Sequence, residues 1–111
     1  MRWKIEFYNA KVMKNILEKW PLGIRAKFSQ TSKLIKEFGL ESIGMPHIKP
    51  FGQGLFEIRV KAAEGIGRAL FCIMKGKVII ILHGFIKKTE QTPQKEIDLA
   101  IKRMREVKEN E

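Results

Sequence analysis

The chain has 111 residues, of which 44% are hydrophobic, a length and composition that predict one globular domain over residues 1–111 and exclude a disordered protein. Its 22 lysine and arginine residues outnumber 12 acidic ones, so the formal net charge at pH 7 is +10. This excess favours a polyanionic partner, namely RNA, DNA or an acidic protein; a basic soluble surface without such a partner is the alternative.

A strand and two helices are predicted at the start of the chain. Residues 3–7 alternate between apolar and charged side chains, a period of two that is typical of a half-buried strand. Asn9 is a suitable N-cap for the apolar residues that recur at helical spacing through residues 12–20. A break at Pro21 separates them from a second helical pattern over residues 24–38, so the two helices form a hairpin.

The middle of the chain is predicted to be a long loop followed by three strands. Glycine and proline recur through residues 40–54, which indicates irregular structure, and long loops are often functional. Residues 56–61 alternate between apolar and charged side chains, residues 68–74 form the next strand, and the unbroken apolar run of residues 78–82 is typical of a strand covered on both faces.

A last helix is predicted after these strands. Thr92 is placed to cap it, with Pro93 at its first position, and an apolar stripe follows over residues 97–107. The order is therefore β-α-α-β-β-β-α. It predicts an α+β fold with a mainly antiparallel twisted sheet, because three strands with short links cannot run parallel. We expect the helices to pack on one face and the other face to stay open and polar.

The single cysteine and the apolar runs bear on the compartment. One cysteine cannot form a disulfide within the chain, which suits a reducing cytosol, and Cys72 is expected to be a small core residue. The N-terminus lacks the apolar segment of a signal peptide, and the longest apolar run, residues 78–82, is too short to span a bilayer. We therefore expect a cytoplasmic protein with no membrane partner.

The pattern of titratable residues offers cations rather than a metal or cofactor site. The two histidines, His47 and His83, are distant in sequence from Cys72, so no zinc constellation is expected, and no nucleotide-binding motif suggests a cofactor. Arginine and lysine can bind RNA phosphates and stabilise charge that develops on them. Because RNA carries its own nucleophile, the 2′-hydroxyl, a metal-free ribonuclease needs only to bend the backbone, stabilise charge and move protons.

Two stretches resemble a known family. These stretches are GLFEIRVKAAEGIGRALFCI (residues 54–73) and HGFIKKTEQTPQKEIDLAIKRM (residues 83–104). Together with the order of elements, they resemble the RelE/HigB superfamily of bacterial toxins, in its HigB-like, phage-associated branch. The resemblance covers nearly the whole chain. It implies the RelE-like toxin fold, the toxin of a type II toxin–antitoxin pair, and cleavage of messenger RNA in the ribosomal A site. It also implies a HigA-like helix-turn-helix antitoxin, through which alone promoter DNA is bound.

The resemblance also assigns roles to residues at the expected charged surface. Arg68 matches an arginine that stabilises transition-state charge, and a catalytic basic residue after the last strand falls at Lys87 or Lys88. We place Lys88 with the catalytic residues. The residues expected to bind RNA are Arg59, Lys61, Lys87 and Lys95. Many relatives have a C-terminal tyrosine or histidine for proton transfer, which this chain lacks. His83 is the best remaining catalytic proton carrier, because histidine changes charge near neutral pH, and Glu90 is the alternative.

Each of these assignments has a structural alternative. His83 follows an apolar run and can be a buried histidine bonded to a neighbouring strand. Arg59 can form an ordinary ion pair with Glu57. Lys87 and Lys88 can be solvated residues at a strand end, and Lys95 can belong to a solvated helix face. For the whole protein, the alternatives to an endoribonuclease are a non-catalytic nucleic-acid-binding module and an inactive toxin that still binds its antitoxin.

Overall fold

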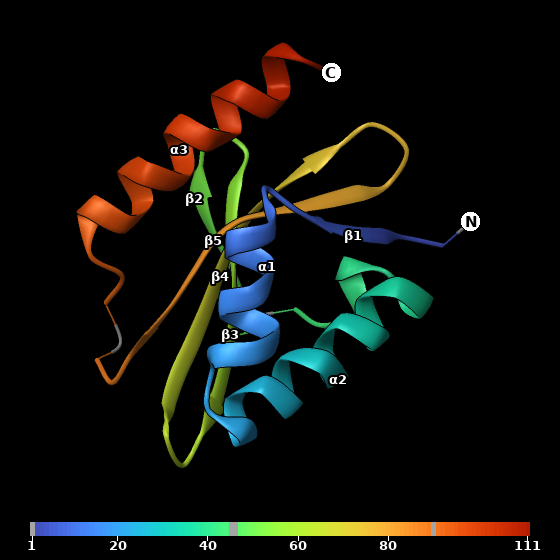
Figure 1. The fold of residues 1–111 in the computed structure, drawn as a ribbon. Helices are drawn as coiled ribbons and strands as arrows, with labels where there is room; N and C mark the ends of the chain where they lie inside the picture. The colour runs from blue at the N-terminus through green and yellow to red at the C-terminus, as the bar shows by residue number, and fades with distance from the viewer. Residues whose placement is uncertain (1, 45–46, 90) are drawn as a thin grey trace.

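The computed structural model describes residues 2–44, 47–89 and 91–111, and within them five strands form one sheet in the order β1-β5-β4-β3-β2 (Figure 1). The strands are β1 (Lys4–Phe7), β2 (Ile48–Gly52), β3 (Leu55–Ala62), β4 (Gly65–Met74) and β5 (Val78–Lys87). The helices are α1 (Ala10–Lys14), α2 (Leu22–Phe38) and α3 (Gln94–Glu109), with a π-helical turn at Asn15–Lys19 and a 3-10 turn at Leu40–Ser42. Among the strands of these described ranges, β1 alone pairs in parallel, with β5. The α+β class and the mainly antiparallel sheet are confirmed.

The N-terminal strand and helical hairpin form where the sequence predicts them. The side chain of Asn9 accepts a hydrogen bond of 2.8 Å from the backbone N–H of Val12, which caps α1. The helix continues as a π-helical turn and ends at Trp20, and Pro21 then stands as the N-cap of α2. Gly39 ends α2 with φ of +87°, a conformation that L side chains rarely adopt.

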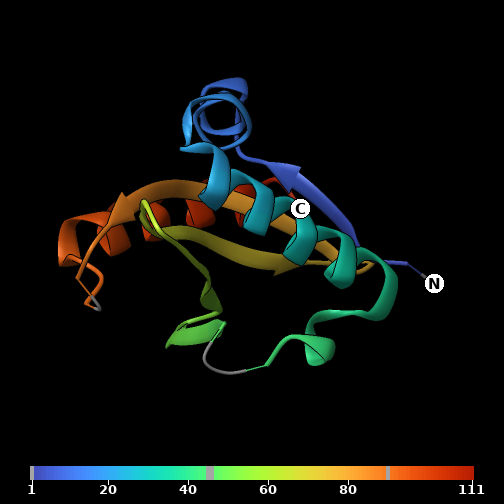
Figure 2. The same cartoon turned by 90° about the horizontal axis from the view of Figure 1, so that it is seen from below.

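The predicted loop over residues 40–54 is wrong in one respect, because it contains β2. This strand pairs antiparallel with β3, and the register shifts between Pro50 and Gly52. Proline is tolerated in β2 because an edge strand forms ladder hydrogen bonds on one side only. Glycine and proline thus exclude a central strand from this stretch but not an edge strand. Figure 2 shows β2 at one edge of the sheet and β1 at the other.

Helices cover both faces of the sheet, which corrects the expectation that all of them pack on one face (Figure 1). On one side, α1 and α2 bury a core that includes Ile24, Phe28 and Ile58. On the other side, Ala100 and Met104 of α3 pack in a second core. The sheet residues of the second core are Leu55, Leu70, Cys72 and Leu82. The central strands carry apolar residues on both faces here, so each face requires a helical cover.

A β-bulge lies in β5 at the last residue of the predicted apolar run. Phe71 pairs with Ile81 and Leu70 pairs with His83, so Leu82 is the extra residue. Ile81 belongs to the core under α1 and α2, whereas Leu82 belongs to the core under α3. The strand does not stop at the end of the apolar run but continues to Lys87. Beyond the bulge, alternate side chains of β5 again face α3, starting with His83.

The lone cysteine is the core residue that the sequence predicts. Cys72 is fully buried among the residues under α3, and burial raises the pKa of its thiol. Within the described ranges, no helix is both long and apolar enough to cross a membrane.

Close contact between β4 and the helical hairpin leads to a stability prediction. A Cβ on Gly67 would lie 2.5 Å from Cγ2 of Ile24 and 2.7 Å from Cζ3 of Trp20, both buried. We expect Gly67→Ala to lower the free energy of unfolding by about 1–3 kcal/mol through overpacking. Urea unfolding should show a lower midpoint with an unchanged m-value.

The matched control is Gly23→Ala in the first turn of α2. The three atoms nearest its new methyl group would be those of the Glu64 carboxylate, at the end of an exposed side chain that can turn away at the cost of one exposed hydrogen bond from the Gly23 N–H. This variant should unfold at nearly the wild-type urea concentration. Equal midpoints for Gly67→Ala and the wild type would contradict the packing described for Gly67.

Candidate functional site

Polar side chains gather at one end of the sheet face that carries α3, a region called here the charged end. Cross-strand partners in an antiparallel sheet point to the same face, so the pairing of β3, β4 and β5 defines it. It consists of three rows, which are Glu57–Leu70–His83, Arg59–Arg68–Phe85 and Lys61–Ile66–Lys87. The expectation of an open polar face is therefore wrong for most of this side of the sheet, because apolar residues and α3 cover all but the charged end.

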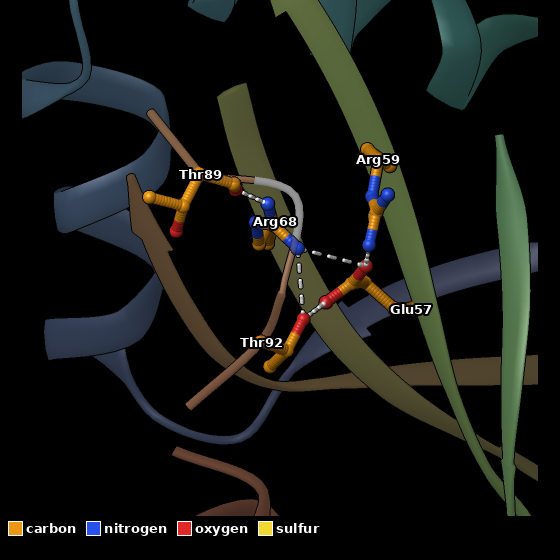
Figure 3. A network of polar contacts seen from close by, with 5 residues as sticks. All are labelled: Glu57, Arg59, Arg68, Thr89 and Thr92. Atoms are coloured by element: carbon orange, nitrogen blue, oxygen red, sulfur yellow. Dashed lines mark hydrogen bonds and ion pairs between the residues drawn. The ribbon is translucent and has the colours of Figure 1, made fainter. Parts of the chain in front are cut away.

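The carboxylate of Glu57 is the centre of a buried polar network (Figure 3). Although fully buried, it accepts hydrogen bonds from Nε and Nη2 of Arg59, at 3.1 and 3.0 Å. The hydroxyl of Thr92 donates to its second oxygen at 2.5 Å, and Nη1 of Arg68 lies 3.8 Å from the first. A buried charge is tolerated only when it is paired and hydrogen-bonded, and these contacts provide both.

Arg68 lies beneath the segment that joins β5 to α3. Its guanidinium is fully buried; Nη1 donates to the Thr92 hydroxyl at 2.9 Å and Nη2 donates to the carbonyl of Thr89 (Figure 3). Thr92 was predicted to cap α3, but Pro93 is the N-cap and no side chain caps the helix. The Thr92 hydroxyl instead connects Arg68 to Glu57, because one hydroxyl can accept and donate at once.

The two predicted arginines are therefore brought together but held inside the protein. Arg59 and Arg68 are directly opposite each other on β3 and β4, as a convergent site requires. The side chain of Arg59 is only 12% exposed and forms the ion pair with Glu57 that the sequence left open as its alternative. In this arrangement neither guanidinium is presented to a large ligand, and their roles toward RNA stay predictions.

The predicted lysines, in contrast, are all exposed. Lys61 and Lys87 flank the buried Ile66 in the last row, one on each side of β4. Lys88 follows the end of β5, and Lys95 lies in the first turn of α3. The accessible positive charge of this region consequently comes from ammonium groups on β3, β5 and the start of α3.

His83 lies at the bulge, between the sheet and α3. Its Nε2 is 3.3 Å from Oε1 of Glu96, an ion pair when the ring is protonated, and the ring stacks on Phe85 with centroids 5.5 Å apart. The side chain is 18% exposed. The partner is thus a helix carboxylate rather than the neighbouring strand that the alternative proposed. Glu90, the other predicted proton carrier, lies outside the described residues.

A separate cluster at the far end of α3 explains the chain's only tyrosine. The hydroxyl of Tyr8 donates to Glu106, which raises the tyrosine pKa, and Arg103 lies 4.9 Å above its ring centroid. Arg103 also donates to the carbonyl of Leu82 at 2.8 Å. These contacts fasten α3 to Tyr8, which follows β1, and to β5.

The sequence reasoning missed Glu57 and Thr92 as members of the site. The two residues lie 35 positions apart in the sequence, and no local pattern links a carboxylate in a strand to a threonine that precedes a helix. The alternation of residues 56–61 did place Glu57 on the charged side of β3. Among the residues that the structure describes, no group of three His, Cys, Asp or Glu side chains is arranged to hold a metal ion.

The fold and the charged end define a small α+β domain with cations from neighbouring strands at one end of its sheet. Residues 15–105 match the family of phage-derived Gp49-like proteins (DUF891), and the chain belongs to this family. It is a RelE/HigB-like family of toxins from toxin–antitoxin systems. No curated protein matches the chain.

The buried network leads to a prediction about stability. Glu57→Gln removes the carboxylate that two arginines share, and breaking a buried ion pair on one side typically costs about 3–5 kcal/mol. We expect a loss of that order in urea unfolding. The double variant Glu57→Met/Arg68→Met should recover part of it, since it removes the fully buried Arg68 charge along with the carboxylate, whereas Arg59, 12% exposed, loses its partner in both variants. A wild-type midpoint for Glu57→Gln would show that this carboxylate does not hold the network together.

Proposed function

We propose that this protein is the toxin of a type II toxin–antitoxin pair and that it cuts messenger RNA in the ribosome without a metal ion. The observation that carries the proposal is that exposed lysines from β3, β5 and the start of α3 gather at one end of the sheet, in a chain of a toxin family. Lys61 and Lys87 stand in one cross-strand row on either side of β4, a spacing that suits a phosphate backbone.

The reaction uses the nucleophile that RNA supplies. The 2′-oxygen attacks the adjacent phosphorus, the bond from phosphorus to the 5′-oxygen breaks, and a 2′,3′-cyclic phosphate and a free 5′-hydroxyl result. One group must accept the 2′-hydroxyl proton and another must donate a proton to the leaving oxygen. Lys61 and Lys87 bind the phosphates on either side of β4, and Lys88 stabilises the charge of the transition state. His83 is the proposed proton carrier, and Lys95 extends the RNA contact.

Arg68 has a different part in this scheme from the one expected. Its buried charge adds positive potential behind the exposed lysines and fixes Thr89 and Thr92 over the end of β4. Direct contact with the reacting phosphate would require these two threonines to release the guanidinium. Arg68→Ala is therefore expected to destabilise the fold, so the loss of activity in that variant alone would not assign a catalytic role.

The proposed partner is a cognate antitoxin with a helix-turn-helix domain, of the HigA kind. A chain of net charge +10 is well suited to an acidic antitoxin segment, and promoter DNA is then bound through the antitoxin. Co-expression with the product of the adjacent gene should relieve toxicity and yield a complex on size exclusion. A neighbouring gene without any such protein would count against the pairing.

A second candidate is a nucleic-acid-binding module without catalysis. Two observations favour it, because Arg68 is fully buried and the described part of α3 carries no tyrosine or histidine. Such a module would bind RNA with a steep dependence on salt and would yield no cut products. The assay that separates the two candidates maps the 5′ ends of transcripts after induction in a bacterium.

The exposed lysines provide the sharpest test of the proposed nuclease. Induction of the wild type should stop growth, and cuts should form in vitro only when ribosomes are present. Lys61→Ala/Lys87→Ala should lower the cleavage rate about 10²-fold, since it removes two phosphate contacts without opening the core.

The matched control is Lys102→Ala/Arg105→Ala, which removes the same charge from exposed positions of α3 away from the charged end. This variant should cleave at nearly the wild-type rate. Equal losses in both double variants would mean that net charge, and not the charged end, determines activity.

The role of His83 has its own test. His83→Gln should slow single-turnover cleavage on ribosomes by about 10²–10⁴-fold if the imidazole transfers a proton. Glu96→Gln removes only the ion-pair partner and should retain most of the activity. Measurement from pH 5.5 to 8.5 also reports whether the histidine determines the pH profile. Wild-type cleavage by folded His83→Gln would remove His83 from the mechanism.

A further inference from the structure

A cavity of about 440 Å³ lies on the α2 side of the sheet, opposite the face that carries α3. Its apolar part consists of Leu34 from α2, Ile43 after the 3-10 turn, and Val60 from β3. Val60 is nearly buried, whereas Leu34 is 42% exposed, so apolar surface is left uncovered there. The volume is within the usual range of small-ligand sites, which is about 300–1,000 Å³.

Polar groups of one electrostatic kind surround this apolar surface. Lys27 and Lys61 border the cavity from α2 and β3, and His47 borders it from the turn just before β2. Gln30, one turn along α2 from Lys27, adds an amide. None of the described residues that line the cavity is acidic. An anionic ligand is therefore favoured, and it must also carry an apolar body to cover Leu34 and Ile43.

Lys61 joins the cavity to the charged end. It stands in the last cross-strand row with Ile66 and Lys87, and it also borders the cavity. Arg59 also borders the cavity, and its guanidinium donates to Glu57. A polyanion that crosses the sheet end at Lys61 thus reaches a cavity with room for one of its units.

We propose that this cavity binds one unpaired nucleotide, with the base on Leu34 and Ile43 and the phosphate at Lys27 and Lys61. The amide of Gln30 can hydrogen-bond to a base edge, as amide side chains do in nucleic-acid recognition. An acidic side chain of a protein is the poorer occupant, because a carboxylate leaves the apolar surface uncovered. That the nucleotide belongs to an RNA chain rests on the function proposed above, whereas binding of the nucleotide itself does not.

Binding is tested by NMR titration of the full ¹⁵N-labelled protein with each ribonucleoside 5′-monophosphate, a single-stranded hexaribonucleotide, inorganic phosphate and a glutamate-rich peptide. We expect saturable shifts at Leu34, Ile43 and Val60 with nucleotides, and tighter binding of the hexanucleotide if the nucleotide comes from RNA. Tighter binding of a monophosphate than of the hexanucleotide would identify a free nucleotide as the ligand. Inorganic phosphate that binds as tightly as nucleotides, or a peptide that alone shifts these residues, would overturn the proposal.

Two variants and a matched control locate the ligand. Lys27→Gln should weaken nucleotide binding about tenfold through the loss of a charge-assisted hydrogen bond, and Leu34→Trp should block the cavity from an exposed position. Lys33→Gln removes the same charge from the side of α2 that lies beside Ile5 and Phe7 of β1, and should bind as the wild type does. Equal weakening by the two lysine variants would show non-specific attraction and contradict the site.

Ribosome-dependent cleavage by the same variants separates this proposal from the proposed function. Cleavage by the wild type without nucleotide shifts at Leu34 would overturn the cavity proposal and leave the nuclease. Nucleotide binding that is lost in Lys27→Gln, in a protein that never cleaves, would support the cavity and overturn the nuclease.

Discussion

The carboxylate of Glu57, buried between two arginines, is the interaction on which the charged end depends. Burying an unpaired carboxylate would lower the stability of the fold by several kcal/mol. The buried carboxylate on β3 therefore requires cations directly beside it. Arg59 comes from the same strand, Arg68 from the next strand, and Thr92 from the segment before α3. One ionised group therefore sets the alignment of two strands and the entry of the last helix.

The same network decides which charges a ligand can meet. Because Arg59 and Arg68 neutralise and surround Glu57, the accessible cations of this face are lysines that stand further along the strands. Arginine suits a buried pair, since its planar group makes several hydrogen bonds at once, whereas lysine is a strongly hydrated point charge suited to the surface. This division explains how two arginines can converge at the charged end while the charge exposed there comes from ammonium groups.

The sequence predicts what periodicity and chain breakers determine, namely β1, the helical hairpin, the three antiparallel strands and the amphipathic α3. It does not predict β2, because Pro50 is compatible with an edge position that only the finished sheet reveals. It predicts that Thr92 caps α3, because local sequence rules do not take into account a carboxylate 35 residues away. The alternation along β3 places Glu57, Arg59 and Lys61 on one face, but how far each is buried depends on contacts between distant segments.

The bulge at Leu82 joins the core to the charged end in a single strand. Without the extra residue, side chains would alternate strictly along β5, and a strand with Leu82 under α3 would direct His83 toward α1 and α2. With it, Leu82 and His83 both lie on the α3 side, and Phe85 and Lys87 follow in the rows of Arg68 and Ile66. The apolar run thus contributes side chains to both cores. Beyond the bulge, the polar residues of β5 lie on the α3 side of the sheet, where the charged end is.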